Sequence, residues 1–166
     1  LYLMNIDGSQ KRVISQDLDA SVSSIQWDAD SKGIFFNYDH HGNGKIGYVT
    51  LNGKLTKIAD HRGGTTLGRP YGSGMFSVSN NGLIAYTYSR PNHPADIALV
   101  NKKGQNWTRL TSLNASLFNY KKLGEVEEIW YNSSVDGRKL QGWIVYPPNY
   151  DTTKKYPFMV ENHGGP

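Results

Sequence analysis

The chain has 166 residues and a mass of 18.6 kDa, which is enough for one domain of ordinary size or for parts of two. Charged residues make up 19% and hydrophobic residues 37%, which excludes a highly charged disordered chain. The complete lack of cysteine excludes disulfides, cysteine-based metal sites and cysteine nucleophiles. The net charge is +4, but the basic residues are scattered singly or in pairs among acids, so no nucleic-acid partner is expected.

The first residues, 1–7, have the pattern of a β-strand and not that of a targeting segment. They lack a basic start and contain an acid at Asp7, so the chain is expected to begin within a fold, as a fragment. No apolar run approaches the roughly 18 residues of a membrane span, and no membrane partner is expected. The compartment stays open between cytoplasm and periplasm, because a lack of cysteine suits both.

Three segments then share a strand–turn–strand pattern, at residues 1–15, 46–60 and 97–112. In the first two, Asp7-Gly8 and Asn52-Gly53 predict two-residue hairpin turns, because glycine and asparagine tolerate the positive φ angles that such turns require.

A second strand–turn–strand pattern alternates with the first, at residues 23–39 and 75–89. Together the two patterns give four short strands in every 45–50 residues or so, a period typical of a propeller blade. The sequence therefore predicts a mainly β fold in which residues 1–112 form about two and a half four-stranded blades of a partial β-propeller. An ordinary antiparallel sandwich or meander of ten strands is the alternative.

The alternating pattern ends after residue 112. Residues 113–124 are expected to connect two domains and to contain a helical turn around residues 113–120. Strands are predicted at residues 128–133, 139–146 and 156–162, with a hairpin turn at residues 134–137 between the first two. The third strand leads into His163-Gly164-Gly165-Pro166.

A His-Gly-Gly loop directly after a buried strand is where α/β-hydrolases place one half of the oxyanion hole. Backbone N–H groups in such a loop stabilise the negative charge that develops on a carbonyl oxygen during acyl transfer. Glycine is needed there because a Cβ would obstruct the close approach of substrate. Alone, this short motif has low specificity.

The surrounding residues make the motif more specific. Residues 134–143, Pro147-Pro148, Lys154-Lys155-Tyr156-Pro157 and residues 163–166 follow one another in an order that resembles the prolyl oligopeptidase family of serine peptidases. The resemblance is to the entry into the catalytic domain of its acylaminoacyl-peptidase and dipeptidyl-peptidase-like branch. It implies that residues 125–166 form the first strands of an α/β-hydrolase domain, truncated after residue 166, and that a propeller gates access to it.

The resemblance also implies the chemistry, which is hydrolysis of short peptides near their N-terminus by a Ser–Asp–His triad, without a cofactor. Gly164 and Gly165 match the oxyanion-hole loop, and His163 and Pro166 flank it, His163 being distinct from the catalytic histidine of the family. No serine in the chain has glycine both two residues before and two residues after it, so the nucleophile motif is absent and the fragment alone is predicted to be inactive. The parent protein could form a homo-oligomer.

The other candidate sites have simpler interpretations. Asp28 and Asp30 lack the distal glutamate of a calcium loop, and His40-His41 is expected to point to opposite sides of an extended strand, so no metal site is predicted. The four tryptophans, with Tyr86 and Tyr88, are expected to fill the packing between sheets. Two other functions remain possible: a non-catalytic, TolB-like propeller that binds protein or peptide, and a lipase or esterase of the same hydrolase fold.

Overall fold

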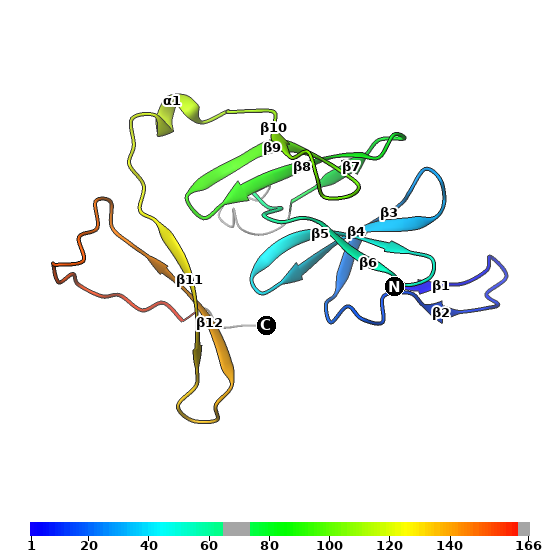
Figure 1. Ribbon diagram of the computed structural model, residues 1–166, viewed down its shortest axis with the longest axis horizontal. Helices are drawn as coiled ribbons and strands as arrows, with labels where there is room; N and C mark the ends of the chain where they lie inside the picture. Colours follow the sequence, from blue (N-terminus) through cyan, green and yellow to red (C-terminus); the bar gives the residue numbers. More distant parts are fainter. Residues whose placement is uncertain (65–73, 163–166) are drawn as a thin grey trace. The chain divides into compact units, whose positions relative to one another are not determined.

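A computed structural model describes residues 1–64 and 74–162. The chain divides into two compact units, Leu1–Lys121 (unit 1) and Lys122–Pro166 (unit 2). Almost all of the regular structure is β-strand (Figure 1), which confirms the prediction of a mainly β chain. The one helix in the described residues, α1 (Ala115–Phe118), falls within the predicted helical turn, and its four residues are far too few to cross a membrane.

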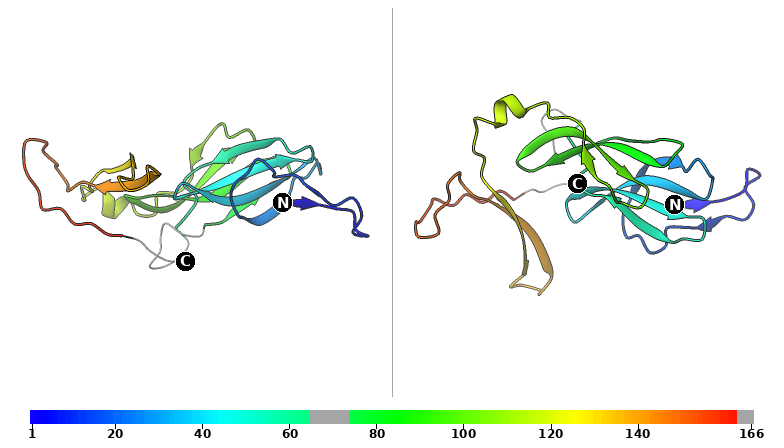
Figure 2. Two further views of the ribbon diagram at one scale, coloured as in Figure 1. Left: turned by 90° about the horizontal axis from the view of Figure 1, so that it is seen from below. Right: turned by 45° about the horizontal axis from the view of Figure 1, so that its top comes forward.

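Unit 1 contains ten described strands in three antiparallel sheets. The first sheet is the hairpin β1–β2, and the other two are four-stranded meanders with the strand orders β3-β4-β5-β6 and β7-β8-β9-β10. Figure 2 shows the two meanders side by side, in cyan and in green. The strands are β1 (Tyr2–Leu3), β2 (Arg12–Val13), β3 (Val22–Trp27), β4 (Gly33–His40), β5 (Asn43–Thr50), β6 (Leu55–Ala59), β7 (Phe76–Val78), β8 (Leu83–Arg90), β9 (His93–Asn101) and β10 (Thr108–Arg109).

The β3–β6 sheet is buried on both faces, as the alternation of side chains along β4 shows. Phe35 points into a first core shared with the β7–β10 sheet, where Phe76, Ile84, Tyr86, Ala98 and Val100 are also buried. Ile34 and Phe36 point to the opposite face, into a second core shared with Ile14 and with partly buried residues near the N-terminus. A strand that is apolar on both faces must lie between two layers, because successive side chains point to opposite sides of a sheet.

The two hairpin turns predicted at Asp7-Gly8 and Asn52-Gly53 are one residue longer than predicted. In the β1–β2 hairpin, Asn5 N–H donates to Ser9 C=O (2.9 Å) and Gly8 N–H donates to Asn5 C=O (2.9 Å), so three residues form the loop. Gly8 has φ +83°, whereas Ile6 and Asp7 keep negative φ angles, which excludes the two-residue turn with two positive φ angles. Gly53, Gly82 and Gly104 adopt positive φ angles in the same hydrogen-bonding pattern.

Unit 2 is built on the hairpin of β11 (Val126–Asn132) and β12 (Lys139–Val145), which are paired from Val126↔Val145 to Asn132↔Lys139. The two strands confirm those predicted at residues 128–133 and 139–146. The third predicted strand, at residues 156–162, is not formed. A strand needs a neighbour for its backbone hydrogen bonds, and no described residue pairs with this segment, in which Phe158 and Met159 are 83% and 91% exposed.

Candidate functional site

The predicted oxyanion-hole residues, His163, Gly164, Gly165 and Pro166, lie outside the described residues. The structure does describe the chain that leads to them, from the β11–β12 hairpin to Asn162.

The β11–β12 hairpin is held on one face by Glu128. Its Oε1 accepts hydrogen bonds from Trp130 Nε1 (2.9 Å) and from Gln141 Nε2 (2.7 Å) on the opposite strand. Trp130 and Trp143 remain 40% and 46% exposed, so the expectation that they fill the packing of this sheet is wrong in the described structure. The reason is that the hairpin has no described second layer to cover it.

After β12 the chain turns around a row of tyrosine rings. The ring centroids of Tyr146 and Tyr150 lie 4.5 Å apart, and those of Tyr150 and Tyr156 lie 5.2 Å apart. Asp151 N–H donates to the Tyr156 hydroxyl (3.0 Å), and hydrogen bonds from Thr153 lower the pKa of the Asp151 carboxyl. These contacts fix the path by which residues 157–162 leave the turn toward the predicted loop.

Asp96, on β9, is the most deeply buried carboxyl group of unit 1. Its Oδ1 accepts hydrogen bonds from the Thr111 hydroxyl (2.7 Å) and from Leu113 N–H (3.0 Å), while Arg109 Nη1 lies 3.8 Å from Oδ2. Burial alone would raise the pKa of Asp96, but these hydrogen bonds and the nearby positive charge lower it. The carboxylate therefore stays ionised and anchors residues 111–113, which is a structural role.

Two other buried polar groups also have structural partners. Arg62 is 6% exposed, and its Nη2 donates to Asp39 Oδ1 (2.8 Å). Asp28 Oδ2 accepts hydrogen bonds from the Tyr48 hydroxyl (3.1 Å) and from Lys102 Nζ (3.2 Å), so an ammonium group already occupies the side on which a cation would bind.

The histidine pair differs from expectation. The rings of His40 and His41 lie on the same side, with centroids 3.7 Å apart, because His41 has φ +51° at the tip of the β4–β5 hairpin and is not extended. Lys45 Nζ lies 3.3 Å from His40 Nδ1, and burial, His41 and Lys45 lower the pKa of His40. The described residues contain no group of three or more potential metal ligands.

Sequence reasoning missed a groove of about 390 Å³ in unit 1, whose lining includes Tyr86, Tyr88 and Trp107. Tyr86 is buried as expected, at 3% exposure, but Trp107 is 47% exposed and forms a wall of the groove. The aromatic alternation of Tyr86 and Tyr88 on β8 was the available signal. This alternation does not distinguish core residues from groove-lining residues, because the exposure of the rings depends on contacts with residues distant in sequence.

No family model matches the chain. Its sequence is similar to dipeptidyl-peptidase 5 of Porphyromonas gingivalis, with 29% identity over 100% of this chain and 23% of the relative. It is also similar to dipeptidyl-peptidase 5 of Schizosaccharomyces pombe, with 26% identity over 96% of this chain and 22% of the relative. The chain thus spans less than a quarter of the length of these curated relatives.

Among solved structures, the fold is similar to that of an acylaminoacyl peptidase in complex with Z-Gly-Gly-Phe-chloromethyl ketone. The TM-score is 0.63 at 18% sequence identity, over 87% of this chain and 21% of the other. At this identity the likeness concerns the fold alone.

Proposed function

The chain is related to the serine peptidases of the prolyl oligopeptidase family, and from this relationship we propose that it is part of a peptidase that hydrolyses short peptides near their N-terminus. The similarity to dipeptidyl-peptidase 5 over the whole of this chain is the observation that carries the proposal. Because the chain covers under a quarter of these relatives, the activity belongs to the protein that contains it.

We further propose that residues 1–112 are two and a half blades of a propeller that gates access of substrate. The two four-stranded meanders and the β1–β2 hairpin supply the strands that this arrangement requires. They pack through two separate cores on the opposite faces of the β3–β6 sheet, as successive blades would. A closed propeller needs at least four blades, so the remaining ones would come from elsewhere in the protein.

Residues 125–166 are proposed to begin the α/β-hydrolase domain. The β11–β12 hairpin and the exposed apolar side chains of Phe158, Met159 and Val160 support this, because strands of such a sheet are covered on both faces. Gly164 and Gly165 would then supply backbone N–H groups to the oxyanion hole. The nucleophile, acid and base would lie outside the 166 residues, since the chain has no G-x-S-x-G motif.

A fluorophosphonate probe and two fluorogenic amides test the proposal in the protein that contains this chain. One amide carries a dipeptide with a free amino group, and the other carries a single N-acetylated amino acid. We expect one probe molecule to be added, seen in the intact mass, and one of the two amides to be hydrolysed. Which amide is hydrolysed distinguishes dipeptidyl-peptidase from acylaminoacyl-peptidase activity, with heat-denatured protein as the control.

Absence of both labelling and hydrolysis would contradict the peptidase proposal and leave the alternative of a TolB-like propeller that binds protein or peptide. Hydrolysis of a short-chain fatty ester, with neither amide cleaved, would instead support the lipase or esterase alternative. The 166 residues alone are expected to give neither labelling nor turnover.

A further inference from the structure

The groove of unit 1 lies between the edge strand β6 and the β7–β10 sheet. Its floor is apolar and belongs to the first core, and is formed by the buried residues Ile58, Ala59, Tyr86 and Val100. Its volume of about 390 Å³ suits a ligand of about two amino-acid residues. Gly104, with φ +73°, brings the β9–β10 turn against β6, where a Cβ would lie only 3.0 Å from the Ile58 carbonyl oxygen.

One wall of the groove is a fixed aromatic cluster. Trp107 Nε1 donates a hydrogen bond to the Tyr86 hydroxyl (2.8 Å), which orients the indole ring. The ring centroids of Trp107 and Tyr88 lie 5.1 Å apart at 61°, and those of Tyr86 and Tyr88 lie 6.3 Å apart at 88°. Because the rings hold one another and Trp107 is still 47% exposed, an aromatic ligand would find a preorganised surface.

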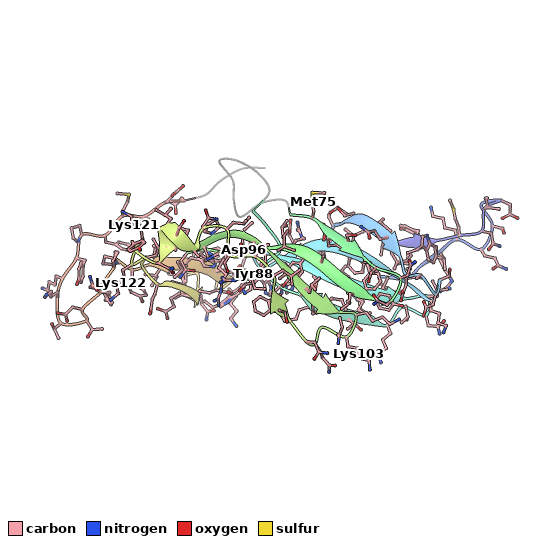
Figure 3. The ribbon with its side chains drawn as sticks, turned by 90° about the horizontal axis from the view of Figure 1, so that it is seen from above. Met75, Tyr88, Asp96, Lys103, Lys121 and Lys122 are labelled. Carbon is pink, nitrogen blue, oxygen red and sulfur yellow. The ribbon has the colours of Figure 1, made fainter. Side chains whose placement is uncertain are left out.

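The charge at the rim of the groove is positive. Lys57 Nζ is neutralised by Asp60 Oδ2 at 2.8 Å, and burial lowers the pKa of His61, whose ring is therefore neutral near pH 7. Lys103 is exposed and makes no ion pair with any residue in the described ranges. Tyr88 and Lys103, both labelled in Figure 3, line the same groove, so an aromatic wall and a positive charge that is unpaired within the described ranges occur in one site.

We propose that this groove binds a peptide segment in which an aromatic residue is adjacent in sequence to an aspartate or glutamate. The aromatic side chain packs against Tyr88 and Trp107, and the carboxylate pairs with Lys103. None of the residues that line this groove belongs to the predicted oxyanion-hole loop, and occupation of the groove does not depend on the peptidase activity.

The test measures fluorescence anisotropy of labelled tetrapeptides with blocked ends, Gly-Phe-Glu-Gly and Gly-Phe-Lys-Gly, with Gly-Ala-Glu-Gly as the control for the aromatic side chain. The complete protein is first treated with the fluorophosphonate, so that turnover cannot consume the peptides. We expect the Phe-Glu peptide to bind at least tenfold more tightly than either of the others.

Two pairs of variants locate the binding. Lys103→Glu should reverse the preference in favour of the Phe-Lys peptide, whereas Lys54→Glu, which makes the same charge change at an exposed lysine outside the groove, should not. Trp107→Ala should weaken binding of the Phe-Glu peptide about tenfold, and Trp27→Ala, at a tryptophan 54% exposed outside the groove, should leave it unchanged.

The inference is overturned if the three peptides bind equally, or if Lys54→Glu changes the preference as much as Lys103→Glu. Because the Lys103 side chain makes no ion pair within the described ranges, that variant tests the site even if Trp107→Ala impairs folding. Loss of probe labelling would contradict the peptidase proposal alone, whereas loss of the peptide preference would contradict this one alone.

Discussion

Lys102 Nζ lies 3.2 Å from Asp28 Oδ2, although 74 residues separate them in sequence. The pair joins the turn between β9 and β10 to the turn between β3 and β4, and so connects the two four-stranded sheets of unit 1. Asp28 is only 4% exposed, whereas the Lys102 side chain is 43% exposed. The buried carboxylate therefore depends on this lysine and on the Tyr48 hydroxyl, which donates to the same oxygen.

Lys102→Ala should lower the free energy of unfolding by about 1 kcal/mol, because it removes a charged partner from a buried carboxylate while the lysine itself is partly solvated. Urea denaturation of the complete protein measures the change. Lys103→Ala is the matched control, because the Lys103 ammonium group makes no ion pair in the described ranges. Its removal should change the free energy of unfolding by less than about 0.5 kcal/mol. Equal effects of the two substitutions would contradict the pairing.

Asp96 should make stability depend on pH in the acid range. Its folded-state pKa is lowered below the ordinary aspartate value of 3.8, so its contribution to stability is present above that value and is lost as the pH falls through the lower, folded-state pKa. Asp96→Asn should therefore destabilise the protein at pH 7, by about 1–3 kcal/mol, and by progressively less as the pH is lowered below 3.8.

The measurement is chemical denaturation between pH 7 and pH 3, with Asp17→Asn as the control at an exposed aspartate that makes no ion pair in the described ranges. Suppose the free energies of unfolding of Asp96→Asn and of the unsubstituted protein differed by the same amount down to pH 3. The hydrogen-bonded carboxylate would then not be the cause of the destabilisation.

The strands of unit 1 could be predicted because their signals are local. Apolar alternation and a glycine after a polar residue occur within ten or so residues, and the structure has strands at each place where the sequence indicated them. Residues 156–162 do not form the strand that their apolar run predicted. An apolar run predicts a strand only if a neighbouring strand is available, and the described residues contain none for it.

The parts that could not be predicted depend on contacts between distant residues. The Lys102–Asp28 pair and the wall formed by Trp107 and Tyr88 arise because two separate sheets pack together, and no short-range pattern reports that packing. The stacked rings of His40 and His41 arise from one positive φ angle at a hairpin tip. A non-glycine residue adopts such an angle too rarely for it to be assumed.

Gly124→Ala should destabilise the start of the β11–β12 hairpin. A Cβ at Gly124 would overlap the Tyr146 carbonyl oxygen, so the backbone must move and weaken the hydrogen bond from Tyr146 N–H to Glu125 C=O (2.9 Å). We expect a loss of about 1–3 kcal/mol in local stability. Faster hydrogen exchange at the Tyr146 amide, relative to amides of β8 and β9, would report it.

The matched control is Gly142→Ala in the same hairpin. A Cβ at that position would meet only side-chain atoms of Ile129 and Tyr131, at 3.5 Å or more, so exchange at Tyr146 should be unchanged. Protection lost equally in both variants would mean that the hairpin responds to any added methyl group and not to the clash at Gly124.

Gly165→Val should lower kcat of the full peptidase far more than it raises KM. The proposed oxyanion hole acts on the charge that develops in the transition state and has little to bind in the ground state. Loss of one such donor typically costs about 3–4 kcal/mol of barrier, or roughly a hundredfold to a thousandfold in kcat. The measurement is steady-state hydrolysis of the amide that the unsubstituted protein cleaves. A larger KM with unchanged kcat would instead place Gly165 in substrate binding, and the oxyanion assignment would be wrong.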